Sequence, residues 1–502
     1  MKFNRDRFDE LRQIFTEITH LRGTRRLLDW DQETYMPRKG QANRAEQNAT
    51  LSRLIHQRVT AKRTGQLIEE LFESAEPKSR DNDAYVCLRQ WRRDYTRQKR
   101  LPTLLVEELS RQSVLAHEAW VRARKESNFS IFLPFFKTLV SLSRQKAEYL
   151  GFSQSPYDAL LDEYEQGLTT KELEQLFSGL VSPLKALMQE ICSRQGDVKS
   201  LKGSFPISGQ KTLAQIAAVK IGFDMCAGRM DTVVHPFSTK IGPGDCRITS
   251  RWNRQDFTEG FFGILHEAGH GIYSQNLPSE WYGTPLGESV SLGIHESQSR
   301  FWENVIGRSR AFWSHFLPIA KGIFPDQLDS MELNEFVRII NKVEPSYIRV
   351  EADEVTYNLH VYLRFVIEKE LIEGKLEPED IPDRWNNLFK ELMGLEVTKD
   401  TLGCLQDVHW SGASFGYFPT YTLGNIYAAM IREALLKEIP KMEEMVQEGS
   451  FEPILNWLNE KIHIQGQRFA PSELIRRVTG ERPCPEPLIR YLKDKFVTLI
   501  PK

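Results

Sequence analysis

The sequence predicts a mainly α-helical protein, and three observations support this prediction. Apolar residues recur every three or four positions through most of the chain, which is the spacing that gathers them on one face of a helix. Alternating strand patterns are scarce, and the best candidate is the stretch DCRITSRW at 245–252. Of the 502 residues, 40% are hydrophobic and 27% are charged, which is the balance of a soluble globular protein with one large or several ordinary domains.

Three stretches carry the helical pattern most clearly. The first, residues 8–30, has apolar residues three or four apart with charges between them. The second, residues 169–196, opens with threonines near a glutamate, which is a helix N-cap signature, and ends near a glycine. Its expected buried stripe is Leu173, Leu176, Leu180, Leu184 and Leu187. The third, residues 481–500, predicts a short final helix.

The soft boundary in the chain is expected at residues 196–212, which are rich in Gly, Ser and Lys and lie between periodic segments. We therefore predict a helical N-terminal lobe over residues 1–205 and a catalytic lobe over residues 206–502. Because the N-terminal helices are expected to return and cover the catalytic lobe, the two lobes form a single unit.

Composition excludes some classes of partner. The formal net charge is -2, which gives no electrostatic reason to expect nucleic acid or an anionic membrane as a partner. No apolar run reaches the roughly 18–20 residues that span a bilayer. The six cysteines are scattered without a CxxC pair, and the first residues do not resemble a secretory signal. A reducing cytoplasmic location is expected.

The strongest chemical signal is HEAGH at 266–270, within a predicted core helix. Positions four apart share one face of a helix, so His266 and His270 can direct two imidazoles at one metal ion. Glu267 lies about 100 degrees round the helix from His266, which suits a carboxylate that holds a water molecule rather than the metal. Gly269 costs up to about 1 kcal/mol inside a helix, which would make sense if another element packs against that turn.

A catalytic zinc normally has three protein ligands, and the third is expected downstream. We choose Glu296, which lies 26 residues after His270, far enough for a second helix to pack antiparallel to the first. His295 is the rival ligand, because neighbouring helix positions point about 100 degrees apart and only one of the two can face the metal. Glu303 is expected to be an exposed surface glutamate, and the alternative is a hydrogen bond to one of the histidines.

Several motifs occur in one fixed order along the chain. They are WDQETYMP at 30–37, DCRITSRW at 245–252, HEAGH, HESQ, IRVEAD at 348–353, GCLQDVHW at 403–410, FGYFPTYTLGN and VTGERPCPEPLIRYLKDKF. Together they resemble the carboxypeptidase Taq family of zinc metallocarboxypeptidases over essentially the full length. Each motif alone is weak to moderate evidence, but the whole series in order is very specific.

The resemblance implies a large helical fold of two lobes with a deep groove and the HExxH motif on a central helix. It implies His266, His270 and Glu296 as Zn²⁺ ligands and Glu267 as general base and acid. Cobalt is expected to substitute for zinc. It further implies a homodimer that removes C-terminal residues one at a time from peptides, with broad specificity and proline disfavoured.

Other residues are candidates for holding the reacting groups. Glu267 is expected to take a proton from the attacking water and pass it to the leaving amine. The oxyanion that forms needs a hydrogen-bond donor, for which Tyr421 and Tyr417 are the candidates. The alternative for each is a packed core tyrosine. His409 is expected to donate to substrate or to the tetrahedral intermediate, and the alternative is a buried histidine satisfied by Asp407 or Gln406.

An exopeptidase must also bind the free C-terminal carboxylate. A guanidinium can do so through two parallel hydrogen bonds, and Arg349 is the first candidate. Arg247 is the second, with a structural ion pair to Asp245 or Asp353 as its alternative. Two other functions compete with this one. The first is a helical endopeptidase with the same HExxH helix, and the second is a helical scaffold that has lost catalysis. The intact Glu267 argues against the scaffold.

Overall fold

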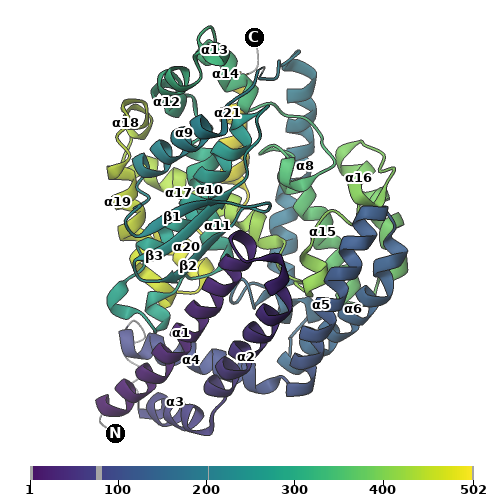
Figure 1. The fold of residues 1–502 in the computed structure, drawn as a ribbon, viewed down its shortest axis with the longest axis vertical. Helices are drawn as coiled ribbons and strands as arrows, with labels where there is room; N and C mark the ends of the chain where they lie inside the picture. Colours follow the sequence, from purple (N-terminus) through teal and green to yellow (C-terminus); the bar gives the residue numbers. More distant parts are fainter. Residues whose placement is uncertain (1–3, 75–81, 202, 500–502) are drawn as a thin grey trace.

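The computed structural model describes residues 4–74, 82–201 and 203–499, and it is mainly helical, as predicted (Figure 1). In the first half, the helices are α1 (Arg5–Thr34), α2 (Gln41–Val59), α3 (Lys62–Ser74), α4 (Asp83–Arg100), α5 (Thr103–Glu126), α6 (Phe129–Leu150), α7 (Pro156–Leu161), α8 (Thr170–Arg194) and α9 (Ile207–Lys220). The three stretches with the clearest periodicity are confirmed as helices, and α8 has the predicted capping box between Thr169 and Glu172.

The second half continues in the same way. Its helices are α10 (Phe257–Gln275), α11 (Leu292–Arg300), α12 (Arg310–Ile323), α13 (Pro325–Leu328), α14 (Leu333–Ile340), α15 (Tyr357–Ile372), α16 (Ile381–Met393), α17 (Pro419–Glu438), α18 (Met442–Glu448), α19 (Glu452–Lys461), α20 (Pro471–Thr479) and α21 (Glu486–Leu499). A π-helix, η5 (Phe301–Ile306), extends α11 without a break. Short 3-10 turns connect several of these elements, among them η4 (Pro285–Gly287) and η6 (Arg349–Glu351).

A small sheet of three strands lies just before the metal helix. The strands are β1 (Gly228–Thr232), β2 (Ser238–Gly242) and β3 (Asp245–Ser250), in the order β1-β3-β2. β3 confirms the strand predicted near 245–252. It pairs in parallel with β1, where Arg229 lies opposite Arg247, and antiparallel with β2. Because β3 packs against α10, the sheet supports the helix that carries HEAGH.

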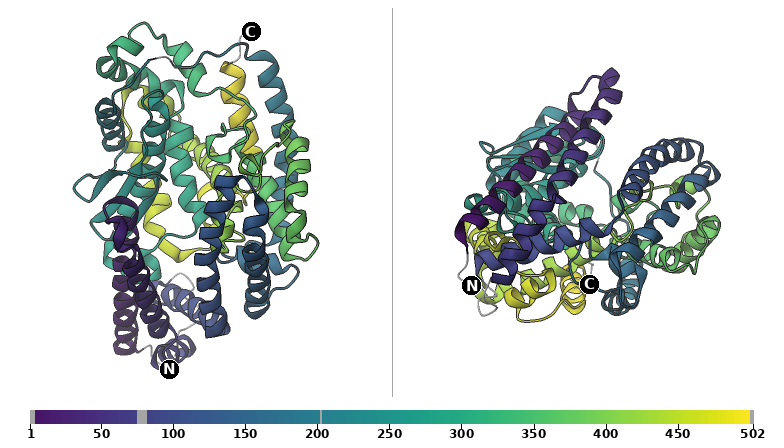
Figure 2. Two further views of the ribbon diagram at one scale, coloured as in Figure 1. Left: turned by 45° about the vertical axis from the view of Figure 1, so that its right-hand side comes forward. Right: turned by 90° about the horizontal axis from the view of Figure 1, so that it is seen from below.

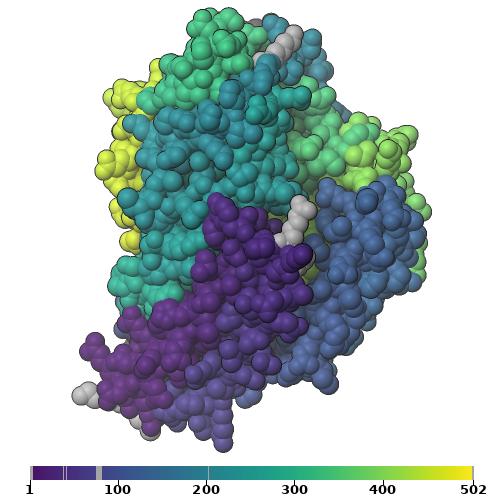
Figure 3. Space-filling view, viewed as in Figure 1, coloured from purple at the N-terminus to yellow at the C-terminus, as the bar shows by residue number. Residues whose placement is uncertain are grey.

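Two hydrophobic cores hold the fold together. The larger core draws buried residues from Ala116 to Phe496 and surrounds α10, whose Leu265, Ala268 and Ile272 are fully buried. The smaller core joins the N-terminal helices around Trp91. Of these helices, α1 also contacts β2 and α4 contacts η4. In Figure 3 the first residues of the chain, in purple, lie at the lower front of the molecule.

Helices distant in sequence lie side by side. In Figure 2, α5, α6 and α8 form one side of the molecule together with α15 and α16, whereas the sheet, α10 and α17 lie on the other side. The predicted division into residues 1–205 and 206–502 remains a prediction. Across the described residues, no helix combines the length and the apolar character that a bilayer crossing needs.

Candidate active site

α10 positions two of the predicted metal ligands. Its first turn is capped by Asp256, which accepts from the Thr258 backbone N–H at 2.9 Å. The helix is buried on most of its surface, so its register against neighbouring helices is fixed by packing. A Cβ atom at Gly269 would lie 2.6 Å from the carbonyl oxygen of Gln298, so only glycine allows α11 to approach this closely. This is the close packing that a glycine within HEAGH predicts.

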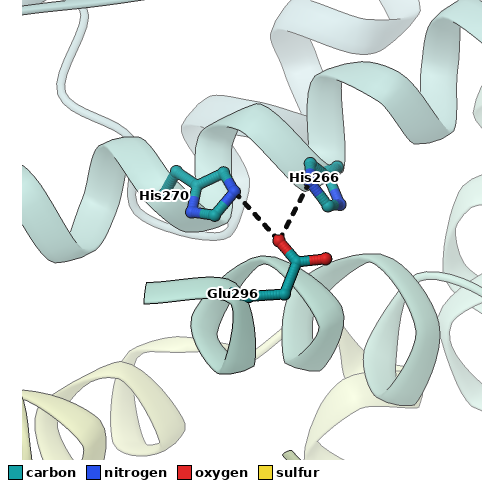
Figure 4. A group of neighbouring side chains, drawn as sticks. All are labelled: His266, His270 and Glu296. Carbon is teal, nitrogen blue, oxygen red and sulfur yellow. Dashed lines mark ion pairs between the residues drawn. The ribbon is translucent and has the colours of Figure 1, made fainter. Parts of the chain in front are cut away.

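The three predicted ligands converge on one point (Figure 4). Oε2 of Glu296 lies 3.5 Å from Nε2 of His266 and 3.3 Å from Nε2 of His270. One donor atom from each residue falls within 4.8 Å of the others. Two imidazoles and a carboxylate are the donor set that a catalytic divalent metal such as zinc takes, with one position left for water or substrate. The residues present therefore fit a metal ion.

The second ring nitrogen of each histidine is already engaged. Nδ1 of His266 lies 2.9 Å from Oε2 of Glu303, and Nδ1 of His270 lies 2.6 Å from Nδ1 of His295. A metal-binding histidine usually bonds through its other nitrogen to a neighbour that fixes the ring, and this leaves both Nε2 atoms for the ion. The expectation that Glu303 is exposed is wrong, because Glu303 is buried where η5 packs against α10. His295 holds a histidine of the group instead of replacing Glu296.

Arg300 organises the carboxylates of this group. It lies one helical turn after Glu296 and pairs with its Oε1 at 2.7 Å and with Oε2 of Glu303 at 3.1 Å. Burial acts to raise the pKa of Glu296, but Arg300 and the two histidines outweigh it and hold that pKa well below its usual range. Burial lowers the pKa of His266, but the charges of Glu296 and Glu303 outweigh this and raise it to about 8. Metal binding below that pH must therefore displace a proton.

Glu267 lies beside the ligand group without belonging to it. Its side chain is buried, and within the described part of the chain it has no hydrogen-bond partner. Burial raises the pKa of Glu267, and the charges of Glu296 and Glu303 add to this, while the two histidines oppose it. A free carboxylate with a raised pKa beside a metal site is suited to take up and release a proton near neutral pH.

A second polar cluster surrounds Arg349, which opens η6 and is 4% exposed. Its Nε and Nη2 atoms donate to Oδ1 of Asp407 at 3.1 and 2.9 Å, and its Nη1 donates to the Tyr357 hydroxyl at 2.8 Å. Asp407 also accepts from Nε of Arg364 at 2.6 Å. Two arginines share one carboxylate, so the cluster keeps a surplus positive charge within a buried environment.

His409 and the two predicted tyrosines adjoin this cluster. Nε2 of His409 lies 3.1 Å from the Tyr421 hydroxyl, and the ring of Tyr417 lies 5.1 Å from that of His409. Burial and the nearby Arg349 lower the pKa of His409 to about 4, so this ring is neutral at pH 7. Nδ1 of His409 is buried and has no hydrogen-bond partner among the described residues, so neither Asp407 nor Gln406 satisfies it.

The two clusters are neighbours. The Arg300 guanidinium lies 4.4 Å from the centre of the Tyr357 ring, and Tyr357 is bonded to Arg349. Burial and, next, the charge of Glu296 raise the pKa of Tyr417 to about 12, which places that tyrosine within electrostatic range of the metal ligands. One site thus combines a metal-ligand group, a free carboxylate, phenol hydroxyls and a guanidinium.

Arg247 lies apart from both clusters. It pairs with Asp245 through two 2.8 Å hydrogen bonds, and its guanidinium lies 4.2 Å from the centre of the Trp30 ring. The predicted alternative for Arg247, an ion pair with Asp245, is therefore present. Asp353 is engaged elsewhere, since it accepts from Glu344, Val355 and Thr356 at the start of α15.

Sequence reasoning missed three residues of the site: Arg300, Tyr357 and Arg364. Arg300 had a signal, because it is four positions after Glu296 on the same helix and that spacing favours an ion pair. Arg364 and Tyr357 lie in α15, and nothing in its local sequence marks them as partners of Asp407 and Arg349.

Comparisons with known proteins relate the chain to carboxypeptidases along its whole length. The family model described as "Carboxypeptidase Taq (M32) metallopeptidase" matches residues 10–496. The chain is 42% identical to thermostable carboxypeptidase 1 of Thermus thermophilus over 98% of both chains, and 38% identical to carboxypeptidase 1 of Bacillus subtilis, again over 98% of both. The structure of an M32 carboxypeptidase from Deinococcus radiodurans R1 superposes with a TM-score of 0.95 at 35% identity, covering 98% of this chain and 99% of that one.

Proposed function

The chain belongs to the carboxypeptidase Taq (M32) family of metallopeptidases, and from this membership we infer how its residues divide the work of a metallocarboxypeptidase. It hydrolyses the C-terminal peptide bond of peptides and depends on a divalent metal. The proposal concerns the identity of the metal, the residues that hold it and the groups that recognise the chain end.

We propose that the metal is zinc, held by His266, His270 and Glu296. The donor set supports this, since two imidazoles and one carboxylate suit zinc, and cobalt is an acceptable substitute. When bound, such an ion supplies a Lewis acid that polarises the substrate carbonyl and makes water a better nucleophile near neutral pH. Glu303 and His295 orient the two histidine rings.

Glu267 acts as the general base and then as the general acid. It takes a proton from the attacking water and passes the proton to the leaving amine. Its raised pKa supports both roles, because such a carboxylate takes up a proton from water more readily than an ordinary glutamate does, and it then holds that proton for transfer to the amine. The Tyr421 hydroxyl, with Tyr417 and His409 beside it, donates to the oxyanion that forms on the substrate.

Arg349 binds the free C-terminal carboxylate of the substrate. The observation that carries this proposal is that Arg349 is linked through Tyr357 and Arg300 to the metal ligand Glu296, so a guanidinium lies beside the metal group. Arg349 uses three of its five N–H groups within the protein, which leaves two for a substrate. Arg247 remains the second candidate. It ranks below Arg349 because its guanidinium is already paired with Asp245 and packs on the Trp30 ring.

Two further proposals follow from family membership: residues leave one at a time with broad specificity and proline disfavoured, and the enzyme works as a homodimer. From the composition of residues 196–212, we propose that residues 1–205 and 206–502 are the lobes of one unit. A reducing cytoplasmic location is supported by the six cysteines, all of which are described and unpaired.

The test is restoration of activity after removal of the metal. The protein is dialysed against a chelator and then receives zinc, cobalt or magnesium at one metal ion per chain. Amino acids released from an unblocked peptide are followed over time. The proposal expects zinc and cobalt to restore the release of single residues in order from the C-terminus. Restoration by magnesium alone would overturn the assignment of zinc, and release of internal fragments would favour an endopeptidase.

A further inference from the structure

A cavity of about 730 Å³ is lined by residues of α12, α14, α18, α21 and the π-helix η5. Three of these helices, α12, α14 and α18, are labelled in the upper left of Figure 1. None of its lining residues is a proposed metal ligand, catalytic residue or substrate-binding residue. The volume falls within the range of sites that hold small molecules. The proposed peptidase mechanism gives this cavity no role.

The cavity has an apolar floor. Val305, Ile306, Val337, Met442 and Val446 line it, and all five side chains are buried in the fold around it. An apolar body placed against them would lose contact with water, which is favourable at about 25 cal/mol for each Å² buried. A purely polar ligand would leave this floor without a partner.

The rim of the cavity is basic. Five cationic side chains line the cavity, against the acidic side chains of Glu443 and Asp494; the cations are Arg308, Arg310, Arg338, Arg432 and Lys495. Three of the five pair with carboxylates, namely Arg308 with Glu303, Arg432 with Glu443 and Lys495 with Glu354.

Arg310 and Arg338 are the cations left for a ligand. In the described part of the chain, neither has a carboxylate oxygen within 4.0 Å. Nε of Arg310 donates to Asn334 at 3.2 Å, and Nη2 of Arg338 donates to the backbone carbonyl of Gln195 at 2.6 Å. Each guanidinium therefore keeps further N–H groups for an anion at the rim.

We propose that this cavity is a binding site for an amphiphilic carboxylate. The carboxylate bonds to Arg310 and Arg338 at the rim, and an aliphatic body fills the apolar floor. Charge complementarity favours an anion over a zwitterion or a neutral ligand, because cations outnumber acids around the cavity. The site is distinct from the catalytic centre, although Arg308 connects its wall to Glu303 and thereby to His266.

Binding of octanoate to the metal-loaded enzyme tests the proposal, measured by titration calorimetry. Octan-1-ol, which has the same chain without the charge, is the matched neutral probe. We expect one octanoate molecule to bind saturably at this cavity in each chain. Octan-1-ol should bind at least tenfold more weakly. The double variant Arg310→Gln/Arg338→Gln should lose at least tenfold in octanoate affinity. Ala311→Trp places a large side chain in the cavity from a half-exposed position, so it should abolish octanoate binding there.

Arg122→Gln is the control, because Arg122 is exposed on α5 and does not line the cavity. It should leave octanoate binding unchanged. Equal affinity in the wild type and in both cavity variants would assign octanoate to the substrate groove and overturn the proposal. Absence of saturable octanoate binding to the wild type would overturn the proposal as well. If Ala311→Trp instead turned a dimer into a monomer, the cavity would be assigned to a second copy of the chain, and this outcome would also overturn the proposal. Neither readout depends on peptidase activity.

Discussion

Oε2 of Glu303 lies 2.9 Å from Nδ1 of His266, on the side of the ring opposite the nitrogen that faces Glu296. The contact fixes the orientation of the ring and makes Nε2 a better ligand. It also links the metal group to Arg300 and Arg308, which both pair with Glu303. A residue that touches neither metal nor substrate is thus expected to set metal affinity.

Glu303→Gln should weaken metal binding by about 10–100-fold, because the amide removes the charge that supports His266. Competition of the metal-loaded protein with a chelator measures the affinity. Glu448→Gln, at an exposed position of α18, is the matched control and should bind metal like the wild type. Equal metal affinities in the two variants would show that Glu303 does not support the metal site.

Glu267→Gln should keep the metal and the fold but lower kcat by at least about 10²-fold, because the amide cannot take a proton from water. Metal content and kcat are measured on the same preparation. Glu259→Gln, at the partly exposed start of the same helix, provides the comparison and should retain activity. An unchanged kcat in Glu267→Gln would mean that another group is the base.

Arg349→Lys should lower kcat/KM for peptides with a free C-terminus by about 10–100-fold, since an ammonium cannot make two parallel hydrogen bonds to a carboxylate. Arg247→Lys is the parallel variant and should change kcat/KM by less than about threefold, because Arg247 is bound to Asp245. If Arg247→Lys lowered kcat/KM more than Arg349→Lys, Arg247 would be the residue that binds the chain end.

Glu165 should make stability depend on pH. Burial raises its pKa from 4.5 to about 7, and Oε2 accepts from the Gly293 N–H at 3.0 Å while Oε1 accepts from the Tyr427 hydroxyl at 2.9 Å. Between pH 4.5 and 7 the folded chain holds a proton that the unfolded chain releases, so the free energy of unfolding falls as pH rises through this window. The loss is about 3 kcal/mol and is complete above pH 7.

Glu165→Gln should remove that loss, because its amide resembles the neutral acid and cannot ionise. Urea unfolding of the wild type and the variant at pH 5 and pH 8 measures the difference between them. From pH 5 to pH 8 the free energy of unfolding of the variant should rise relative to that of the wild type by about 2.5 kcal/mol. Parallel pH dependence in the two proteins would show that Glu165 is ionised throughout.

The helical fold and the convergence of the two histidines of HEAGH were predictable because both rest on local periodicity. A spacing of four on a helix directs His266 and His270 to one side in any context. Glu296 was chosen as the third proposed ligand because its distance from His270 allows a second helix to pack antiparallel to the first, and in the structure its carboxylate lies beside both rings. The glycine at position 269 correctly indicated a close neighbour, which proved to be α11.

The rest depends on which helices meet, and a local pattern does not contain that information. Glu303 resembles a surface glutamate until η5 packs on α10 and buries it. Asp407 and Arg364 are 43 residues apart and become partners only in the folded chain. Gly424 is similar, since a Cβ atom there would lie 2.3 Å from Cγ of Glu296, yet nothing in the sequence of α17 indicates that contact.

In the proposed mechanism, one site joins a metal-dependent hydrolytic group to a guanidinium that recognises the free chain end. The most direct measurement follows the products of two peptides of one sequence, one with a free C-terminus and one amidated, over time with the zinc-loaded enzyme. We expect single residues to leave in order from the free peptide, and we expect the amidated peptide to be cleaved about 10–100-fold more slowly. Equal cleavage of both peptides, or internal fragments from either, would contradict this mechanism.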